Sequence, residues 1–266
     1  MTALNALVNL TEALSSLGPV AVAASGGVDS MTLAVVAHRL FGKDALIVHA
    51  VSPAVPPQAT ERVKAHAEAE GWNLKIVDAE EFKDERYLAN PVNRCFYCKF
   101  NLYDRIASVT ELPIVSGTNT DDLSDYRPGL EAAKDHQVTH PFVMANIDKD
   151  AIRAIARHLN LGDLSELPAA PCLSSRLQTG VTVTPERLLF VNKVEGYISD
   201  LLSPKTVRCR ILAKQVEIQL DLESFDKLDG ADKYRDQIIA FAGIDQSLPI
   251  KFAAYKKGSA FVQASS

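Results

Sequence analysis

One short glycine-containing stretch limits what this chain can fold into more than any other feature. An apolar run over residues 20–24 stops at two glycines, residues 26–27, and an apolar segment with helical spacing, residues 31–40, starts soon after them. A strand that ends in a glycine turn and opens a helix places backbone N–H groups and the positive end of a helix dipole at one point. Adjacent glycines let the main chain approach an oxyanion closely, and Ser25 and Ser30 add hydroxyl donors. The stretch therefore predicts a phosphate-binding loop between a first strand and its helix.

The segments after this loop alternate between strand and helix patterns. Short apolar runs, many of them β-branched, predict four more strands at residues 45–50, 74–77, 114–116 and 138–142, with helical patterns between most of them. Such alternation predicts an α/β fold, a parallel sheet with helices on both faces. Ligands of these sheets bind beyond the carboxyl ends of the strands, which is where the glycine loop falls.

The pattern changes near residue 178. A Thr184-Pro185 pair, typical of a helix N-cap and first turn, precedes a helical pattern over residues 186–202. Strand patterns follow at 207–212, 216–220 and near 250–254, with a helix around 234–242. We therefore expect a first domain over residues 1–178 and a smaller α+β domain, for substrate binding and oligomerisation, over residues 179–266.

Composition and charge narrow the compartment and the partners. The chain of 266 residues is 47% hydrophobic and 23% charged, as ordinary soluble proteins are. It has neither an apolar run of membrane-spanning length nor a signal-like N-terminus, so the sequence predicts a cytoplasmic protein without a membrane partner. The net charge of −5 argues against nucleic acid as a partner, because tRNA-binding enzymes need a strongly basic face.

The four cysteines point to metal binding or catalysis, because so few in a chain of this length do not indicate a disulfide scaffold. Cys95 and Cys98 form a C-x-x-C pair, which alone is open to a redox pair, half a zinc site or chance. With Cys172, three thiolates converging on one point would suit an iron–sulfur cluster with one open iron. The sequence leaves that convergence an assumption. Cys209 stands alone in a predicted strand, where a buried free thiol is expected.

Several motifs together resemble a known family. Residues 25–30 (SGGVDS) resemble the PP-loop of the ATP pyrophosphatase superfamily and fit neither the Walker loop nor the dinucleotide fingerprint. From residue 20 to 178, the order and approximate spacing of the motifs resemble the LarE-type ATP-dependent sulfur transferases. The other motifs are residues 93–99 (NRCFYCK), 117–122 (GTNTDD), 125–129 (DYRPG) and 171–176 (PCLSSR), with a weaker similarity at 207–210 (VRCR) and 255–259 (YKKGS).

This resemblance implies an activity and its ligands. Members of that family use ATP to adenylate the carboxylates of a pyridinium biscarboxylate mononucleotide, release pyrophosphate and replace carboxylate oxygen by sulfur, on the way to the nickel-pincer cofactor. It thus implies ATP, Mg²⁺, a small-molecule mononucleotide substrate and a homo-oligomer. For the sulfur it offers two routes, a Cys172 that gives up its own sulfur or a [4Fe-4S] cluster held by three cysteines. The extra pair Cys95 and Cys98 favours the cluster.

The resemblance also implies the site residues. Asp29 would lie close to Mg²⁺, and three arginines would bind the phosphate and carboxylate of the substrate as bidentate donors. For two of them, Arg208 and Arg210, a solvated strand face is the alternative, because residues two apart in a strand share one side. Asp121 and Asp122 follow the fourth predicted strand. They are interpreted equally well as residues of the site at this sheet edge or as acidic residues of a helix N-terminal turn. The implied nucleotide and substrate contacts are Ser25, Gly26, Gly27, Asp29, Ser30, Ser52, Gly117, Asn119, Arg176, Arg208 and Arg210, and the implied catalytic and metal-binding residues are Asp29, Cys95, Cys98 and Cys172.

Two other functions stay open at the level of the sequence. One is a PP-loop tRNA thiolase, or a related amide- or thioamide-forming ATP pyrophosphatase. The other is a non-catalytic nucleotide- or metal-binding protein whose cysteines hold structural zinc. Salt-dependent RNA binding would indicate the first alternative, and pyrophosphate release from ATP would exclude the second.

Overall fold

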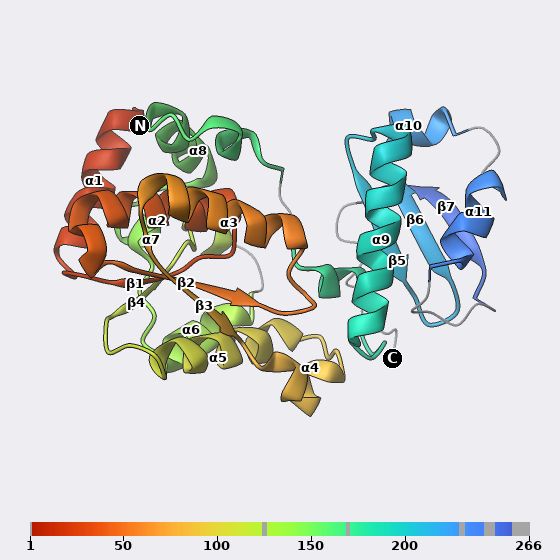
Figure 1. Ribbon diagram of the computed structural model, residues 1–266, viewed down its shortest axis with the longest axis horizontal. Coiled ribbons are helices and arrows are strands. Elements are labelled where there is room, and N and C mark those ends of the chain that lie inside the picture. Colours follow the sequence, from red (N-terminus) through yellow and green to blue (C-terminus); the bar gives the residue numbers. More distant parts are fainter. Residues whose placement is uncertain (1, 124–126, 169–170, 229–231, 242–247, 257–266) are drawn as a thin grey trace. The chain divides into compact units, whose positions relative to one another are not determined.

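The computed structural model describes residues 2–123, 127–168, 171–228, 232–241 and 248–256. The chain divides into two compact units, the first formed by residues 1–81 and 95–170 and the second by residues 82–94 and 171–266 (Figure 1). The second unit thus takes in residues 82–94, a segment that lies between the two parts of the first unit along the chain. The functional division expected after residue 178 stays a prediction.

A parallel sheet of four strands forms the centre of the first unit. Its order is β3-β2-β1-β4, and each neighbouring pair is parallel. The predicted α/β class is therefore confirmed. The strands are β1 (Ala21–Ala23), β2 (Leu46–Val51), β3 (Asn73–Asp78) and β4 (Ile114–Ser116).

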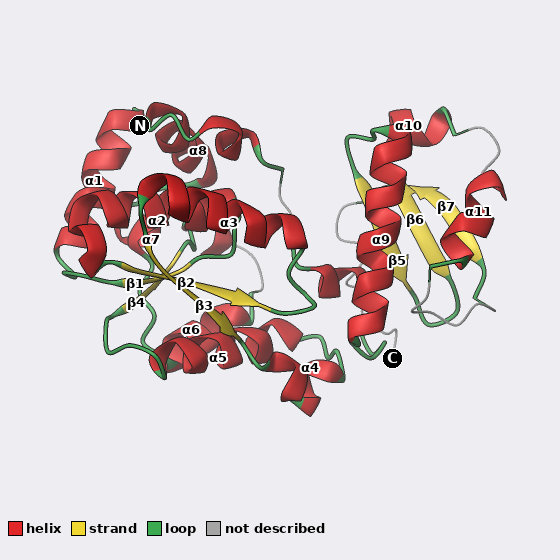
Figure 2. Ribbon diagram, in the orientation of Figure 1, coloured by secondary structure: helices red, strands yellow, loops and turns green. Residues whose placement is uncertain are grey.

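Helices cover both faces of this sheet (Figures 1 and 2). Alternate residues of β1 pack into a different core cluster on each face. Val22 belongs to a core cluster with side chains of α1, α2 and α8, whereas Ala21 and Ala23 belong to a second cluster with side chains of α5 and α6. Successive strand residues point to opposite faces, so a strand buried on both sides reads as a continuous apolar run. The helices are α1 (Ala3–Ser15), α2 (Val28–Phe41), α3 (Pro57–Glu70), α5 (Arg94–Ala107), α6 (Gly129–Asp135), α7 (Pro141–Met144) and α8 (Lys149–His158), with short 3₁₀ turns η1 (Gly42–Asp44), η2 (Glu81–Lys83), η3 (Thr120–Leu123) and η4 (Gly162–Glu166).

The predicted fifth strand at residues 138–142 is wrong. Only one parallel bridge forms there, between Thr139 and Val115, with the Thr139 amide donating to the Ile114 carbonyl at 2.9 Å. Pro141 then begins α7. Proline has no N–H for a strand ladder, and its fixed φ suits the first turn of a helix, so the pairing stops where the apolar run continues.

The second unit packs one long helix, α9 (Pro185–Leu202), on a sheet of order β5-β6-β7 (Figure 2). The β5–β6 pair is antiparallel and the β6–β7 pair parallel, as in a small α+β fold. Thr184 caps α9 by accepting a hydrogen bond from the Arg187 amide at 3.3 Å, as the Thr-Pro pair predicts. The other elements are α4 (Glu85–Leu88), η5 (Leu173–Arg176), β5 (Val207–Ile211), β6 (Val216–Leu220), α10 (Leu222–Asp226), α11 (Asp232–Ile239) and β7 (Ile250–Ala254). Within the described ranges, no helix has both the length and the hydrophobicity needed to cross a membrane.

Candidate functional site

The loop between β1 and α2 is shaped by its own serines. The Ser30 hydroxyl accepts a hydrogen bond from the Ser25 amide at 3.0 Å, and the two hydroxyl oxygens also lie 3.0 Å apart. Gly27 is the N-cap of α2 and, among the described residues, no side-chain hydrogen bond caps this helix. The first amides of α2 are thus left for another acceptor, and the positive end of the helix dipole favours an anion there. The loop has the form that phosphate binding requires.

Two glycines of this site are needed because main chains meet there. Gly26 has φ of +82°, and a Cβ at this position would lie 2.7 Å from the Ala59 carbonyl oxygen of α3. Gly117 follows β4, and a Cβ there would lie 2.7 Å from the Ser30 amide. A side chain at either position would force the backbone apart. The structure therefore brings Gly117, far along the sequence, against the glycine loop as expected for one site.

Asp29, in the first turn of α2, forms an ion pair with the side chain of Lys149 at the start of α8. Burial raises the pKa of the Asp29 carboxyl above its ordinary value, and Lys149 acts in the opposite direction. The charge of Asp122 lies near enough to raise this pKa further. The second oxygen of Asp29, Oδ1, is buried and has no hydrogen-bond partner among the described residues. An unpartnered carboxylate oxygen next to a second acid fits a site for a hard cation such as Mg²⁺.

The turn after β4 gathers the predicted polar residues at the same sheet edge. Asn119 is buried, and its side chain accepts a hydrogen bond from the Asp121 amide at 3.0 Å. Asp122 accepts from the Asn119 amide at 3.2 Å and pairs with Arg127 at 2.8 Å. Asp121 accepts from the Lys149 amide at 3.1 Å. The interpretation of the two acids as turn residues is thus supported, and Asp122 is in addition close to Asp29.

The carboxyl end of β2 carries further buried polar groups. Ser52 follows β2 and hydrogen-bonds the Glu81 side chain, whose pKa is raised by burial. His49 is fully buried and bridges the Ala24 carbonyl oxygen at 2.8 Å and the Thr60 hydroxyl at 2.9 Å. Burial lowers the pKa of His49, so a neutral ring that donates from Nδ1 and accepts at Nε2 satisfies both partners. Ser52 therefore lies at the predicted edge of the sheet.

None of the four cysteines, all of which fall within the described ranges, takes part in a disulfide. Cys95 and Cys98 lie near the start of α5, three residues apart and so on one face of the helix, and both are partly exposed. Cys172 is partly exposed and is the N-cap residue of η5 in the second unit. Since the pair belongs to the first unit, convergence of the three thiols stays a prediction. No group of three metal-binding side chains occurs within the described parts of the chain. Cys209 is buried, and burial raises the pKa of its thiol well above the ordinary value, as expected for a structural cysteine.

Arg176 holds the segment that carries Cys172. Its side chain is 4% exposed, and its guanidinium binds the Glu195 carboxylate of α9 through two hydrogen bonds of 2.9 and 3.0 Å. It also donates to the Pro171 carbonyl oxygen at 2.8 Å, while Glu195 accepts from the Cys209 amide at 2.9 Å. Arg176 thus connects the Cys172 segment to α9 and β5. Its expected contact with substrate stays a prediction.

Arg208 and Arg210 lie on β5 and differ in their surroundings. Arg210 is 6% exposed and donates to the Gln219 side chain at 3.1 Å, so a solvated strand face is the wrong description for this residue. Burial lowers the pKa of both guanidiniums, and the nearby positive charge of Arg176 lowers it further. Glu195, which pairs with Arg176, offsets part of this charge and acts on both pKa values in the opposite direction. The three arginines still outnumber this carboxylate, and such a group suits a phosphate or carboxylate ligand.

Parts of two expected motifs, Asp125-Tyr126 and residues 257–259, lie outside the described residues. Sequence reasoning missed Lys149 and Glu195. Lys149 gave one usable signal, because a lysine in the first turn of a helix opposes the helix dipole and so suggests a nearby anion. Glu195 lies in a helix with an ordinary charged face, where nothing distinguishes it from the other acids.

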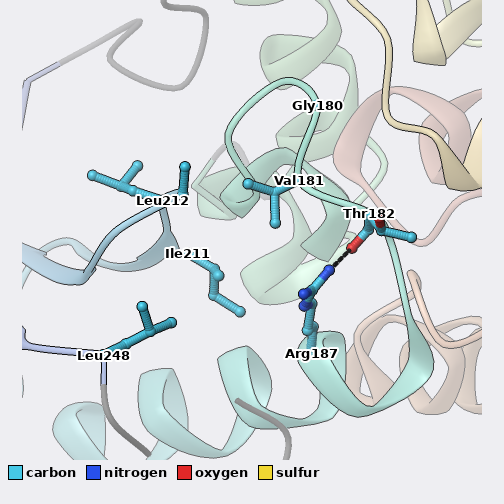
Figure 3. Close-up of a pocket in the computed structure, with 8 residues that line it drawn as sticks. Gly180, Val181, Thr182, Arg187, Ile211, Leu212 and Leu248 are labelled. Atoms are coloured by element: carbon cyan, nitrogen blue, oxygen red, sulfur yellow. Dashed lines mark hydrogen bonds between the residues drawn. The ribbon is translucent and has the colours of Figure 1, made fainter. Parts of the chain in front are cut away.

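A pocket of about 210 Å³ occurs within the second unit (Figure 3). Arg187 reaches across one side of it to donate to the Thr182 carbonyl oxygen at 2.6 Å. None of the site residues expected from the sequence lines this pocket. The lining residues are Gly180, Val181, Thr182, Arg187, Ile211, Leu212, Ala213 and Leu248.

Comparison with family models gives no match. Among curated proteins, the uncharacterized protein slr1717 of Synechocystis is 36% identical over 225 residues, which cover 83% of each chain. The pyridinium-3,5-bisthiocarboxylic acid mononucleotide synthase of Lactiplantibacillus plantarum is 29% identical over 216 residues, or 79% of this chain and 78% of that enzyme. A component of the glutamine-hydrolyzing GMP synthase of Methanopyrus kandleri is 29% identical over 198 residues, or 67% of this chain and 62% of that protein.

These similarities extend over both units and agree with the glycine loop, the parallel sheet and the acidic site at its carboxyl edge. The mononucleotide synthase, which is a LarE protein, and the GMP synthase component are both PP-loop proteins, and they differ in what their names say they make. The chain therefore belongs to the family of slr1717, a LarE-like family of PP-loop proteins.

Proposed function

We propose that this protein is an ATP-dependent sulfur transferase that adenylates a carboxylate of pyridinium biscarboxylate mononucleotide and converts it into a thiocarboxylate. The observation that carries the proposal is the arrangement of Asp29, Lys149 and Asp122 around the open N-terminus of α2. Anion-binding amides, a cationic side chain and carboxylates that can hold Mg²⁺ together suit the phosphates of a nucleotide. The named activity of the Lactiplantibacillus relative supplies the substrate class.

In this proposal the loop amides and Lys149 bind the two phosphates that leave ATP as pyrophosphate. Asp29 and Asp122 would hold Mg²⁺, which fits the buried and unpartnered Oδ1 of Asp29. Bound there, Mg²⁺ neutralises charge on the phosphates. Lys149 is paired with Asp29 and has a flexible four-carbon stem, so it is able to turn from the carboxylate to a phosphate oxygen when the nucleotide binds.

Adenylation solves a specific chemical problem. A carboxylate is a poor electrophile, because its charge repels nucleophiles and oxide is a poor leaving group. Attack of a carboxylate oxygen on the α-phosphorus of ATP releases pyrophosphate and leaves an acyl adenylate. A sulfur nucleophile then attacks the acyl carbon, and AMP departs with the oxygen. We assign the recognition of the substrate's phosphate and free carboxylate to Arg208 and Arg210, within the positive charge concentration of the second unit.

For the sulfur source we propose a [4Fe-4S] cluster held by Cys95, Cys98 and Cys172. The donor set fits such a group in kind: three partly exposed thiols, two of them one helical turn apart. When bound, the cluster supplies a sulfide at the iron that no cysteine ligates. The other route, in which Cys172 gives up its own sulfur, would leave no function for the cysteine pair on α5.

The test is pyrophosphate release with ATP and the pyridinium biscarboxylate mononucleotide, together with the mass of the pyridinium product. We expect release that requires the carboxylate substrate, and a product in which sulfur has replaced oxygen. Asp29→Asn should lose the release, whereas Asp135→Asn, an exposed acid of α6, should retain it. Release without the carboxylate substrate, or a product without sulfur, would contradict the proposal.

A further inference from the structure

The side of the glycine loop that faces α3 carries a contact that the proposed chemistry does not use. The guanidinium of Arg62 donates from Nη1 to the Gly26 carbonyl oxygen at 2.6 Å. Around this contact α3 lies close against the loop, since the Ala59 carbonyl oxygen occupies the space that a Cβ of Gly26 would need. The buried His49 adds a bridge from the Ala24 carbonyl to Thr60 of α3. The N-terminal turns of α3 therefore fix the conformation of the loop.

The contact of Arg62 decides which way one peptide group faces. A trans peptide is planar, so its carbonyl and N–H point in opposite directions. Because the Gly26 carbonyl is held on the α3 side, the Gly27 N–H must point away from α3. The φ of Gly27, −84°, is one of the two torsion angles that set this orientation.

Apart from this contact, the peptide has a long hydrogen bond, from the Gly27 N–H to the Ser25 hydroxyl at 3.4 Å, which restrains it weakly. Both of its flanking residues are glycines, so no Cβ opposes a rotation of the peptide plane by half a turn. The rotated peptide would present the negative end of its dipole, the carbonyl oxygen, where an N–H is needed for an anion. A charged donor on a short hydrogen bond is among the stronger restraints available.

We propose that Arg62 is a positioning residue for phosphate binding, which keeps the Gly26–Gly27 peptide in the orientation that presents its N–H to the pyrophosphate group of the nucleotide. The inference rests on the proposed use of ATP, and it adds a residue outside the PP-loop to that machinery. It also accounts for the double glycine. Gly26 permits the close approach of α3, and Arg62 fixes the peptide orientation that two neighbouring glycines would otherwise leave free to rotate.

The first test is binding of pyrophosphate with Mg²⁺ to the full chain by calorimetry. Arg62→Met retains the apolar stem and removes the donors. We expect pyrophosphate to bind about tenfold more weakly, because a hydrogen bond to a charged group is lost. Adenosine, which has no phosphate, should bind equally well to both proteins. The matched control is Lys64→Met, two residues along α3, where an exposed lysine pairs with Glu61 at 3.0 Å, and it should bind pyrophosphate as the unmodified chain does.

A second test separates positioning from direct attraction between Arg62 and the phosphates. Rotation of the peptide would bring residue 27 to a positive φ, which alanine avoids, while its observed φ of −84° suits alanine. Among the described residues, a Cβ at Gly27 would meet the Ser25 hydroxyl alone, at an ordinary 3.6 Å. Arg62→Met should therefore cost much less pyrophosphate affinity in a Gly27→Ala background than in the unmodified loop.

The outcomes are distinct. An unmodified chain that binds neither ATP nor pyrophosphate would contradict the proposed function itself. An unmodified chain that binds pyrophosphate while Arg62→Met binds it equally well, or loses adenosine in the same proportion, would overturn the role of Arg62. Equal costs of Arg62→Met in the two backgrounds would show that Arg62 acts through its charge and not through the peptide.

Discussion

At Asp29, burial and charge act in opposite directions on one carboxyl. Burial disfavours the ionised form and raises its pKa, and Asp122 adds to this effect, whereas Lys149 stabilises the ionised form. The motif SGGVDS was enough to select Asp29 from the sequence. Lys149 was not found in this way, because it lies 120 positions further along the chain and reaches Asp29 only when α8 is in place. Spacing within a motif is readable from the sequence, but a partner from a distant helix is not.

Replacing Lys149 by methionine should change the pH dependence of pyrophosphate release. Without the lysine charge, the pKa of Asp29 rises further, so the ionised form needed for Mg²⁺ is reached only at higher pH. We expect a lower rate at neutral pH and an acidic limb of the rate profile that moves toward alkaline pH. The measurement is pyrophosphate release as a function of pH, with Lys134→Met of α6 as a control of equal chemistry on the surface. An unshifted acidic limb would show that Lys149 does not act through Asp29.

Among the elements, the first four strands were predictable from short apolar runs, and the fifth was not. Residues 138–142 have the composition of a strand, yet Pro141 begins a helix there. The Cys172 segment shows a second limit. Its short 3₁₀ turn, η5, is held by Arg176, which in turn is held by Glu195 on α9. The motif PCLSSR indicated that Arg176 matters. Only the structure shows that its guanidinium is bound to the protein.

Glu195→Gln should therefore both destabilise the second unit and loosen the Cys172 segment. Removing one partner of a buried ion pair leaves the Arg176 charge uncompensated, which costs about 3–5 kcal/mol in the free energy of unfolding. Urea unfolding measures this loss, and the rate of Cys172 alkylation under native conditions should rise. Glu223→Gln is the matched control, because Glu223 pairs with Lys205 and Lys227 on the exposed surface, and it should change neither quantity. Unchanged alkylation in a destabilised Glu195→Gln would limit the pair to a structural role.

For the whole molecule, the sequence predicted an α/β part followed by a smaller α+β part, and each is observed as a sheet of the expected type. It did not predict that residues 82–94 belong with the second unit. A segment that leaves one unit and returns to it has no signature in local periodicity, because its membership depends on long-range hydrogen bonds. Tyr87, for example, bonds to the Ser174 hydroxyl at 2.6 Å, and Arg94 to the Ser174 carbonyl at 2.9 Å.

The proposed sulfur source depends on cysteines from both units. If Cys95, Cys98 and Cys172 hold a [4Fe-4S] cluster, protein prepared without oxygen should be brown and carry about four irons per chain. Replacing any of the three by alanine should remove both the colour and the sulfur transfer. Cys209→Ala is the control, because this thiol is fully buried within β5 and its pKa is raised well above the ordinary value, so it should retain both. Intact-mass analysis after turnover distinguishes the cluster from Cys172 as the sulfur source. A chain that has lost hydrogen sulfide at Cys172, with Cys95→Ala still active, would establish Cys172 as the sulfur donor. It would exclude the cluster, because a cluster held by all three cysteines needs Cys95.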